Sequence, residues 1–310
     1  MTRFALPRFL LAVAIVAVVG AHLESTHAQT PVAAGADLDR SLQVDGRDRI
    51  YHVHIPAMGA QPAGFPLLIV LHGGTGNGSR MAQKSGFSEL ADREGFIVVY
   101  PDGTGLVNNR FTWNADICCG YAHRKNVDDV GFISALIDRL IEDFDVDPAR
   151  VYVTGYSNGA MMSFRLACEL SDTIAAAAPY AGALNSDVCA ATEPVPILIM
   201  NGEDDENVPV AGGRSPDAGA PAQNDRVDQP TSYAVETWVG IDGCSDIPDV
   251  TDSDSVRVST YGSCRGGSVV EQVLIHDWDH AWPSAENGSK IDAASIVWEF
   301  VSRFAKSAAD

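Results

Sequence analysis

The sequence predicts an α/β protein with an open, mostly parallel central sheet and helices on both faces of that sheet. Short, continuous apolar runs such as PLLIVLHGG and GFIVVYPDG recur along the chain, and such runs are typical of strands buried on both faces. Between them, longer segments repeat apolar residues every three or four positions, as amphipathic helices do. Because the two kinds of segment alternate, they indicate parallel strands joined by helical crossovers.

The expected elements follow one another in that alternating order. The first strand, at 49–56, alternates apolar and polar residues and should be half-buried. Residues 211–230 are rich in Gly, Pro, Ala and Asp, which predicts a long surface loop. Buried strands are expected at 66–74, 95–103, 150–155, 175–182, 194–202 and 268–276, and helices at 127–144, 158–170, 232–240 and 293–305. In such sheets ligands bind at the carboxyl ends of the strands.

Residues 1–28 have the pattern of a secretory signal peptide. Arg3 and Arg8 give a basic start, an apolar run covers 9–21, and small residues suited to cleavage follow at Ala21 and Ala28. The alternative, a membrane anchor, is disfavoured because this run is too short to cross a bilayer. We therefore expect a protein secreted to the periplasm or the medium. After the signal peptide we expect a flexible segment at 29–40 and a single domain at 41–310, because no linker or repeat divides the remainder.

The chain is strongly acidic, with 41 acidic and 21 basic side chains and a net charge of −20. Removal of residues 1–28 would leave 40 acidic and 19 basic side chains, a net charge of −21. Such a surface repels phosphate backbones and anionic lipid headgroups. Neither nucleic acid nor a membrane is therefore expected as a partner, and the composition leaves the oligomeric state open.

Six cysteines lie beyond the predicted signal peptide: Cys118, Cys119, Cys168, Cys189, Cys244 and Cys264. An even number in an exported chain favours disulfides, and no Cys-x-x-Cys spacing indicates a metal or redox site. Cys244 and Cys264 flank one polar, turn-rich segment, so we expect these two to pair. The other four are expected to pair among themselves in an order that the sequence leaves open; free structural thiols are the alternative.

Ser157, in the segment VYVTGYSNGAMM, is the candidate nucleophile. It directly follows a predicted buried strand and directly precedes a predicted helix, with Gly155 and Gly159 on either side. This is the pattern of a nucleophile elbow, in which a sharp strand-to-helix turn exposes the serine hydroxyl at the edge of the sheet. An ordinary glycine turn is the alternative, but the strand before it and the helix after it favour the elbow.

A serine hydroxyl needs an imidazole to take its proton and a carboxylate to orient that imidazole. In this architecture the acid and then the histidine follow the serine along the chain. His276 and His280 are the two histidines beyond Ser157. His276 ends the last predicted strand, so we favour His280, in the loop that follows, as the base.

The orienting acid should come directly after an intervening strand. Glu203, Asp204 and Asp205 all follow the strand predicted at 194–202. Acidic runs in loops are usually solvated, so at most one of the three is expected to be functional. Their spacing alone does not choose among them.

Two backbone amides should stabilise the negative oxygen that forms during acyl transfer. The Asn158 amide follows the nucleophile at the start of a helix. The second donor should come from LHGGTGNGS, where Gly74 is preferred and Thr75 is the alternative. His72 precedes the serine and is expected to support this loop. Phosphate binding by these glycines is disfavoured because no Lys-Ser/Thr pair follows them.

Two tryptophans lie beside the predicted site, Trp113 in FTWNADICCG and Trp282 in HAWP. Either residue would suit the wall of a binding site for an acyl or aromatic group, and packing in the core is the alternative.

Taken together, these motifs resemble one family. LHGGTGN, WNADICCG, NVDDVGFI, RVYVTGYSNGAMM, NGEDDENVP and HDWDHAWP occur in the order seen in the polyhydroxybutyrate depolymerase and feruloyl esterase-like group of secreted α/β-hydrolases, often called carbohydrate esterase family 1. The resemblance covers about residues 40–305 and implies the α/β-hydrolase fold, ester hydrolysis by a serine, and no metal or organic cofactor. The family pattern His-Gly-x-x-Asp-x-x-Val-Pro places the acid on Asp205, and His-x-Trp-Pro places the base on His280.

The sequence departs from the family pattern near the expected site. Asn201 stands where the family usually has His, Val210 where Tyr is common, and DWD replaces the glycines that usually precede the base. None of these changes removes a catalytic group, so they bear on the substrate rather than on the reaction.

The resemblance implies a secreted esterase that acts on hydroxyalkanoate polyesters or their oligomers, and feruloyl or acetyl esters on plant polysaccharide are the alternative. A peptidase is disfavoured because nothing here resembles the extra propeller or lid that such enzymes carry. A non-catalytic binding protein on the same fold is disfavoured because every catalytic part is present.

Overall fold

The computed structural model describes residues 1–2, 33–59, 61–214 and 226–307. The chain divides into two units, Met1–Pro31 and Val32–Asp310, and all the strands and helices given below belong to the second. Nearly all of the predicted signal peptide, and the beginning of the predicted flexible segment, lie outside the described residues.

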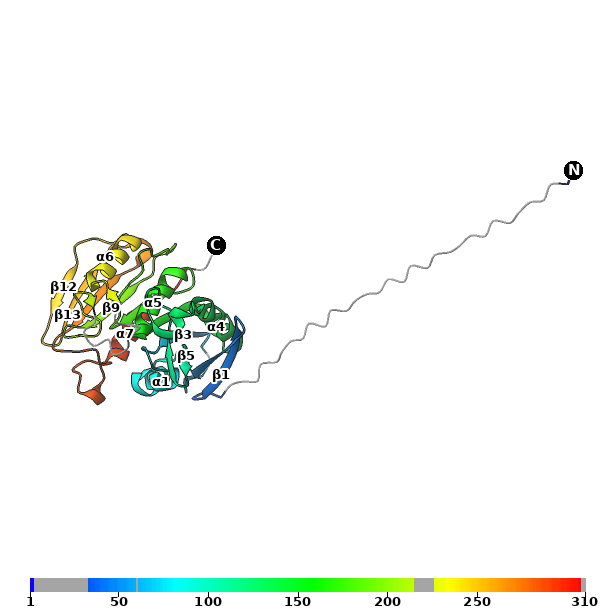
Figure 1. Ribbon diagram of the computed structural model, residues 1–310, viewed down its shortest axis with the longest axis horizontal. Helices are drawn as coiled ribbons and strands as arrows, with labels where there is room; N and C mark the ends of the chain where they lie inside the picture. The colour runs from blue at the N-terminus through cyan, green and yellow to red at the C-terminus, as the bar shows by residue number, and fades with distance from the viewer. Residues whose placement is uncertain (3–32, 60, 215–225, 308–310) are drawn as a thin grey trace. The chain divides into compact units, whose positions relative to one another are not determined.

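A ten-stranded sheet forms the centre of the second unit, in the order β1-β2-β4-β3-β7-β8-β9-β14-β13-β12. The central strands from β4 to β14 in this order are parallel, and the two outer strands at each edge are antiparallel to their neighbours. Figure 1 shows β1 and β12 at opposite edges, with β3 and β9 between them. The strands are β1 (Asp37–Val44), β2 (Arg47–His54), β3 (Phe65–Leu71), β4 (Ile97–Pro101), β7 (Val146–Tyr156), β8 (Ala176–Tyr180), β9 (Ile197–Gly202), β12 (Asp249–Asp252), β13 (Val256–Tyr261) and β14 (Val270–Ile275).

Helices cover both faces of this sheet. One face carries α4 (Asp129–Asp143), α5 (Asn158–Glu169) and α6 (Thr231–Asp242), and the other carries α1 (Gly78–Ser85), α2 (Phe87–Glu94) and α7 (Ala293–Val301). The expected α/β architecture is therefore confirmed. The remaining elements are a hairpin of β5 (Thr104–Val107) and β6 (Arg110–Thr112), the ribbon β10 (Gly213–Arg214) and β11 (Val227–Asp228), the short helix α3 (Gly120–Arg124), and the 3-10 turns η1 (Arg265–Gly267) and η2 (Ala285–Asn287).

The buried strand β3 shows how a continuous apolar run supports this layered arrangement. Leu67, Ile69 and Leu71 join the core on the side of α4, α5 and α6. Leu68 and Val70 join the core on the side of α1, α2 and α7. Because successive side chains of a strand point to opposite faces, an alternating pattern would have filled only one of the two cores.

Two expectations about loops are corrected by the structure. Residues 37–40, placed in the flexible segment 29–40, belong to β1, where Asp37 pairs with His54 of β2 in the antiparallel register. The expected loop 211–230 contains the ribbon of β10 and β11, and its residues 215–225 lie outside the described residues. In both cases an antiparallel partner strand supplies the backbone hydrogen bonds, β2 directly after Asp45 and Gly46 in the first case, and composition alone does not reveal such a partner.

All six cysteines are paired. Cys244 and Cys264 form a disulfide between the end of α6 and the segment after β13, as the sequence led us to expect. Cys168 at the end of α5 pairs with Cys189 in the segment that follows β8. Cys118 pairs with its neighbour Cys119 in the segment before α3. These pairings resolve the order of the four cysteines that the sequence had left open.

A buried ion pair anchors the segment that carries Trp113. Arg49 Nη2 of β2 donates to Asp129 Oδ1 at 2.7 Å, and both side chains are almost completely buried. The second Asp129 oxygen accepts the Asn114 amide at 2.8 Å. The Arg49 guanidinium also lies 3.8 Å from the centre of the Phe132 ring. Asp129 therefore ties the start of α4 both to the sheet and to the segment before α3.

We expect Asp129→Ala to lower the free energy of unfolding by about 3–5 kcal/mol, because it leaves the Arg49 charge buried without its partner. Urea unfolding followed by circular dichroism measures the change. Asp138→Ala, at an exposed position on the same helix, is the matched control and should change stability by less than about 0.5 kcal/mol. Equal effects of the two substitutions would contradict this account of Asp129.

Candidate active site

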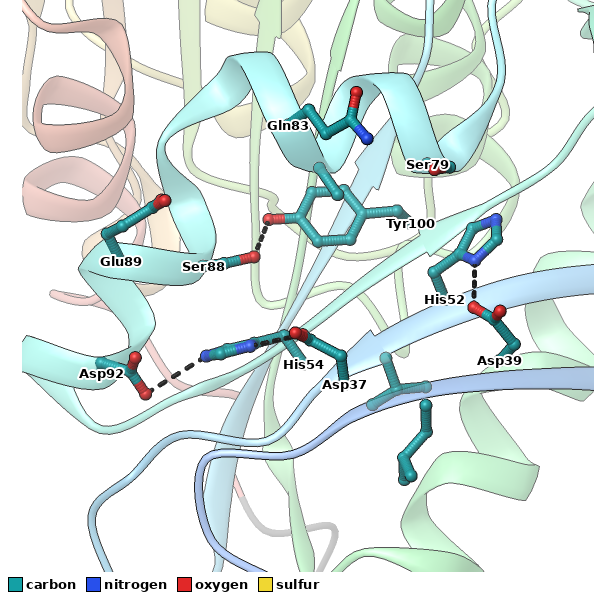
Figure 2. Close-up of a pocket in the computed structure, with 13 residues that line it drawn as sticks. Asp37, Asp39, His52, His54, Ser79, Gln83, Ser88, Glu89, Asp92 and Tyr100 are labelled. Atoms are coloured by element: carbon teal, nitrogen blue, oxygen red, sulfur yellow. Dashed lines mark hydrogen bonds and ion pairs between the residues drawn. The ribbon is translucent and has the colours of Figure 1, made fainter.

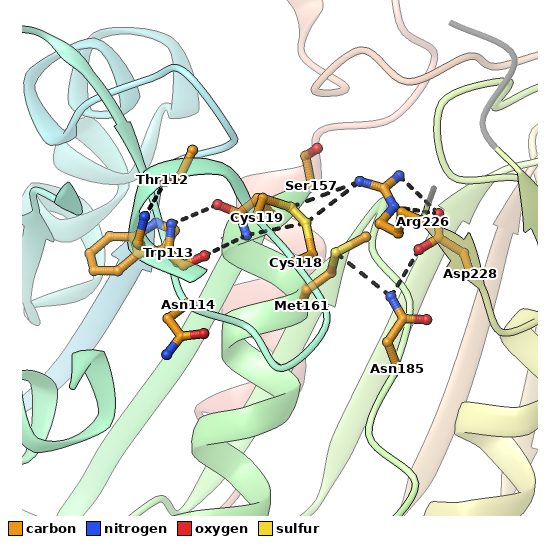
Figure 3. The surroundings of a disulfide bond; sticks show 12 residues. Thr112, Trp113, Asn114, Cys118, Cys119, Ser157, Met161, Asn185, Arg226 and Asp228 are labelled. Atoms are coloured by element: carbon orange, nitrogen blue, oxygen red, sulfur yellow. Dashed lines mark hydrogen bonds and ion pairs between the residues drawn. A yellow bond between two sulfur atoms is a disulfide. The ribbon is translucent and has the colours of Figure 1, made fainter. Parts of the chain in front are cut away.

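Ser157 occupies a sharp turn between β7 and α5. Its backbone has φ 58° and ψ −119°, a conformation that side-chain-bearing residues rarely adopt and that costs about 1–3 kcal/mol. The Ser157 amide donates to Tyr180 O of β8 at 3.0 Å, and Ser157 O accepts the Met161 amide at 3.0 Å. Figure 3 shows the hydroxyl projecting from the N-terminal end of α5.

The two glycines around this turn are required by close packing. A Cβ atom on Gly155 would lie 2.4 Å from Gly159 O, and a Cβ atom on Gly159 would lie 2.4 Å from Leu71 O. Each gap is too short for a carbon and an oxygen that are not bonded. The pattern Gly-x-Ser-x-Gly therefore lets β7, α5 and β3 meet directly beneath the serine.

Ser157, His280 and Asp205 come together in one hydrogen-bonded chain. Ser157 Oγ donates to His280 Nε2 at 2.9 Å, and His280 Nδ1 donates to Asp205 Oδ2 at 2.6 Å. Because a carboxylate only accepts hydrogen bonds, it holds the proton of a neutral imidazole on Nδ1 and leaves Nε2 free to accept. Asp205 is buried, and its Oδ1 accepts the amides of Asn207 and Val208, both at 2.8 Å. This arrangement has the geometry of a serine hydrolase triad.

The other acidic residues of the turn after β9 have different surroundings. Glu203 accepts from His276 Nδ1 at 2.8 Å, and Asp252 of β12 accepts from His276 Nε2 at 2.9 Å. These two carboxylates raise the pKa of the His276 imidazole. Asp204 is exposed. His276 therefore joins the turn after β9 to an edge strand, and of the two histidines only His280 contacts Ser157 within the described residues.

Two tyrosines hold the backbone of the loop that carries His280. Tyr156, directly before the nucleophile, donates from its hydroxyl to His280 O at 2.7 Å. Tyr180, at the end of β8, donates to Ala281 O at 2.5 Å, and Trp278 Nε1 donates to the same oxygen at 2.8 Å. Burial raises the pKa of both tyrosine hydroxyls. Both therefore stay protonated and act as donors, and the base is fastened to strands β7 and β8.

The Gly74 backbone lies close to Asn158, the residue that follows Ser157. A Cβ atom on Gly74 would lie 3.7 Å from Asn158 Cβ. The Thr75 amide, the alternative donor, is already bonded to Phe111 O at 2.8 Å. The Asn158 amide belongs to the first turn of α5, where backbone N–H groups have no partner within the helix and the helix dipole is positive. Of the two candidates Gly74 and Thr75, Gly74 is the one whose amide makes no hydrogen bond among the described residues.

His72 supports this loop from within. Its Nδ1 donates to Gly73 O at 2.8 Å and its Nε2 accepts the Gly103 amide at 3.0 Å. Burial lowers the pKa of His72 to about 4, so the ring is neutral and keeps this donor–acceptor pattern. The supporting role expected for His72 matches these contacts.

The two tryptophans do not wall the site, and that expectation is corrected. Trp113 is fully buried and donates from Nε1 to His72 O at 2.9 Å, and Trp282 is nearly buried and donates from Nε1 to Ser85 O at 3.3 Å. Both indole rings fill the core behind the catalytic loops, where packing stabilises more than exposure would.

The Asn158 side chain has a structural role that the sequence analysis missed. Its Oδ1 accepts the Trp113 amide at 2.7 Å and its Nδ2 donates to Trp113 O at 3.1 Å. The carboxamide thus closes a two-bond bridge between the start of α5 and the segment that carries Cys118. The polar side chain directly after Ser157 was the one sequence feature that could have indicated this role. Its partner Trp113, however, lies 45 positions away.

A hollow elsewhere in the molecule is lined by none of the three residues Ser157, His280 and Asp205. It measures about 380 Å³ and lies between β1, β2, α1 and α2. Figure 2 shows His54 held between Asp37 and Asp92, at 2.8 and 3.2 Å, and His52 bonded to Asp39 at 2.6 Å. These contacts fasten the edge strand β1 and helix α2 to β2. Within the described residues no group of three or more His, Cys, Asp or Glu side chains is arranged to hold a metal ion.

The fold and the hydrogen-bonded chain at Ser157 define an α/β-hydrolase of the serine class. A sequence model of the family described as Esterase PHB depolymerase matches residues 50–211. The chain belongs to this family.

Three relatives show the range of the similarity. A protein of Nocardia uniformis subsp. tsuyamanensis named as the esterase NocK is 32% identical over 82% of this chain and 76% of its own length. Feruloyl esterase B of Piromyces equi is 30% identical over 78% of this chain and 44% of its own length. Poly(3-hydroxyalkanoate) depolymerase C of Paucimonas lemoignei is 30% identical over 74% of this chain and 58% of its own length. The chain thus spans about half the length of the last two proteins.

We expect Tyr156→Phe to lower kcat for a nitrophenyl ester by about 2- to 10-fold with little change in KM, because one hydrogen bond worth about 0.5–1.5 kcal/mol no longer holds the His280 backbone. Steady-state kinetics and a thermal unfolding curve measure both properties. Tyr233→Phe is the matched control, since its hydroxyl also donates to a carbonyl, Ser186 O at 3.0 Å, but on α6. An unchanged kcat in Tyr156→Phe, or an equal loss in both variants, would contradict this role.

Proposed function

We propose that this chain is a serine esterase in which Ser157 is the nucleophile, His280 the general base and acid, and Asp205 the orienting carboxylate. The observation that carries the proposal is the continuous pair of hydrogen bonds from Ser157 Oγ through His280 to Asp205, at 2.9 and 2.6 Å. Membership of an esterase family supports it independently.

The proposed reaction has two halves. Ser157 Oγ attacks the ester carbonyl as its proton passes to His280 Nε2, and the amides of Asn158 and Gly74 donate to the resulting oxyanion. The C–O bond to the alcohol then breaks, and His280 gives its proton to the leaving oxygen. A water molecule attacks the acyl-enzyme in the same way, returning the proton to Ser157 and releasing the acid. Each step uses only groups of the chain, the ester and water.

The substrate we favour is an ester of a hydroxyalkanoic acid, as a polymer or as its oligomers. The family description and the name of the Paucimonas relative support this choice. Feruloyl esters on plant polysaccharide are the second candidate, and the name of the Piromyces relative favours them.

Export of the protein is part of the proposal. The predicted signal peptide lies outside the described residues, but the three disulfides are typical of proteins from oxidising compartments. In the described part of the chain, none of the helices has the length and apolar character needed to cross a bilayer.

Ser157→Ala should reduce turnover of a short-chain nitrophenyl ester by at least about 10⁴-fold, because the nucleophilic oxygen is lost while the fold remains. Active-site labelling with a fluorophosphonate probe should disappear in the same variant. The thermal unfolding midpoint serves as the control for folding. Retained turnover in a folded Ser157→Ala protein would refute the proposed mechanism.

A substrate panel separates the two candidates. We expect the protein to release hydroxybutyrate from oligomeric 3-hydroxybutyrate esters faster than it releases ferulate from a feruloylated arabinoxylan oligosaccharide, measured by chromatography at equal ester concentration. Faster ferulate release would reverse the choice of substrate and leave the catalytic assignment unaffected.

A further inference from the structure

The disulfide Cys118–Cys119 lies between the start of α5 and an arginine. Asn158 Nδ2, next to the nucleophile, is 3.8 Å from Cys118 Sγ. Arg226 Nη1 is 3.6 Å from Cys118 Sγ and 3.9 Å from Cys119 Sγ. Figure 3 draws Ser157 and Arg226 among the residues that surround this disulfide. The disulfide therefore joins Arg226 to Asn158, the residue that follows Ser157 in the chain.

The hydrogen bonds of Arg226 leave one end of its guanidinium without an oxygen partner. Nε donates to Asp228 Oδ2 at 3.0 Å, and Nη2 lies 2.8 Å from the same oxygen. Nη2 also donates to Asn207 O at 3.1 Å, in the turn that carries Asp205. Among the described residues, Nη1 has its contacts with the two sulfur atoms, and sulfur is a weak acceptor. Arg226 is thus held rigidly by Asp228 and Asn207, with Nη1 available to a stronger acceptor.

A small hollow of about 30 Å³ is lined by Arg226 and by both cysteines of the disulfide. Arg226 and the disulfide form one side of it, and Ile117, His123 and Arg124 line the rest. Arg124 is exposed and has no hydrogen-bond or ion-pair partner within the described residues. Two arginines therefore line one hollow, on a chain whose net charge is −20. Only the Arg226 charge is balanced, by the buried carboxylate of Asp228.

We propose that this hollow binds a carboxylate carried by the substrate close to the ester that is hydrolysed. A guanidinium held in place donates to a carboxylate with good geometry and little loss of side-chain entropy. The free cation Arg124 would add attraction in a molecule that otherwise repels anions. The inference rests on the proposed esterase function, and it specifies the substrate class of that site.

Two kinds of ester carry such a group. An oligomer of 3-hydroxybutyrate ends in a free carboxylate. The hollow would bind this acid end, and it would therefore favour short oligomers over long polymers, in which most ester bonds lie far from the chain end. An acylated xylo-oligosaccharide can instead carry a glucuronate branch near an ester. Both present the same carboxylate chemistry, and the substrates below distinguish them.

The test compares matched pairs of substrates on the full mature protein. One pair is the linear 3-hydroxybutyrate trimer with a free carboxylate and the same trimer as its methyl ester. The other pair is an acetylated xylo-oligosaccharide with and without a glucuronate branch. Kinetics are measured for the wild type, Arg226→Gln, Arg124→Gln and the control Arg139→Gln, which removes an exposed charge on α4 that is paired with Asp143.

We expect Arg226→Gln to raise KM for the free-acid trimer about 10-fold or more, because a hydrogen bond between charged groups is worth about 1.5–3 kcal/mol. Arg124→Gln should raise it about 2- to 5-fold, as expected for an exposed charge. In both variants KM for the free acid should rise more than KM for the methyl ester or for a neutral nitrophenyl ester, and Arg139→Gln should match the wild type. If KM rises selectively only for the oligosaccharide with glucuronate, the hollow binds a carboxylate as proposed, and the substrate is the polysaccharide ester.

Several outcomes would overturn the proposal. One is equal KM values for charged and neutral members of both pairs in the wild type. Another is an equal rise in KM for the charged and the neutral member of a pair in Arg226→Gln and Arg124→Gln. If Arg226→Gln fails to fold because Asp228 is left buried without its partner, Arg124→Gln still decides, and no selective effect there would count against the hollow. Failure of the esterase function itself would be recognised separately, as loss of nitrophenyl ester hydrolysis by the wild type.

Discussion

The close contact of β7, α5 and β3 beneath Ser157 is the constraint on which the rest of the site depends. Gly155 and Gly159 allow three backbones to meet where no Cβ atom would fit. The turn between them forces Ser157 into a positive φ, and hydrogen bonds to β8 and α5 hold it there. The same turn leaves the first amides of α5 unbonded beside the hydroxyl. One packing arrangement thus positions both the proposed nucleophile and one of the proposed oxyanion donors.

His280 and Asp205, the proposed base and acid, lie on loops, and hydrogen bonds to the sheet restrain each loop. Tyr156 and Tyr180 bond the backbone at His280 and Ala281 to the ends of β7 and β8. The two amides bonded to Asp205 Oδ1 orient its carboxylate, and the pair of Glu203 with His276 ties the same turn to the last parallel strand. These restraints keep three distant side chains within hydrogen-bond distance, which acyl transfer requires.

Charge is distributed unevenly over the molecule. Acidic residues dominate the chain, and several pair with histidines at the two edges of the sheet. Beside the disulfide Cys118–Cys119 the hollow is instead bordered by Arg124 and Arg226. The carboxylate site proposed here would place this local positive charge on a chain whose overall charge repels polyanions.

The sequence by itself determined the parallel sheet and the helices α4 to α7, and it predicted Ser157 as the nucleophile. These follow from local patterns, because an apolar run or a Gly-x-Ser-x-Gly turn acts within a few residues of the chain. Chain order also favoured His280 as the base, and the family resemblance predicted Asp205 as the orienting acid. Only the tertiary structure decided what depends on partners far along the chain. Such partners buried Trp113 and Trp282, bonded Asp205 to His280 and Glu203 to His276, and brought Arg226 to the disulfide. Contacts across more than a hundred positions, such as Arg226 with Cys118, follow from how the elements pack and leave no periodic signal in the sequence.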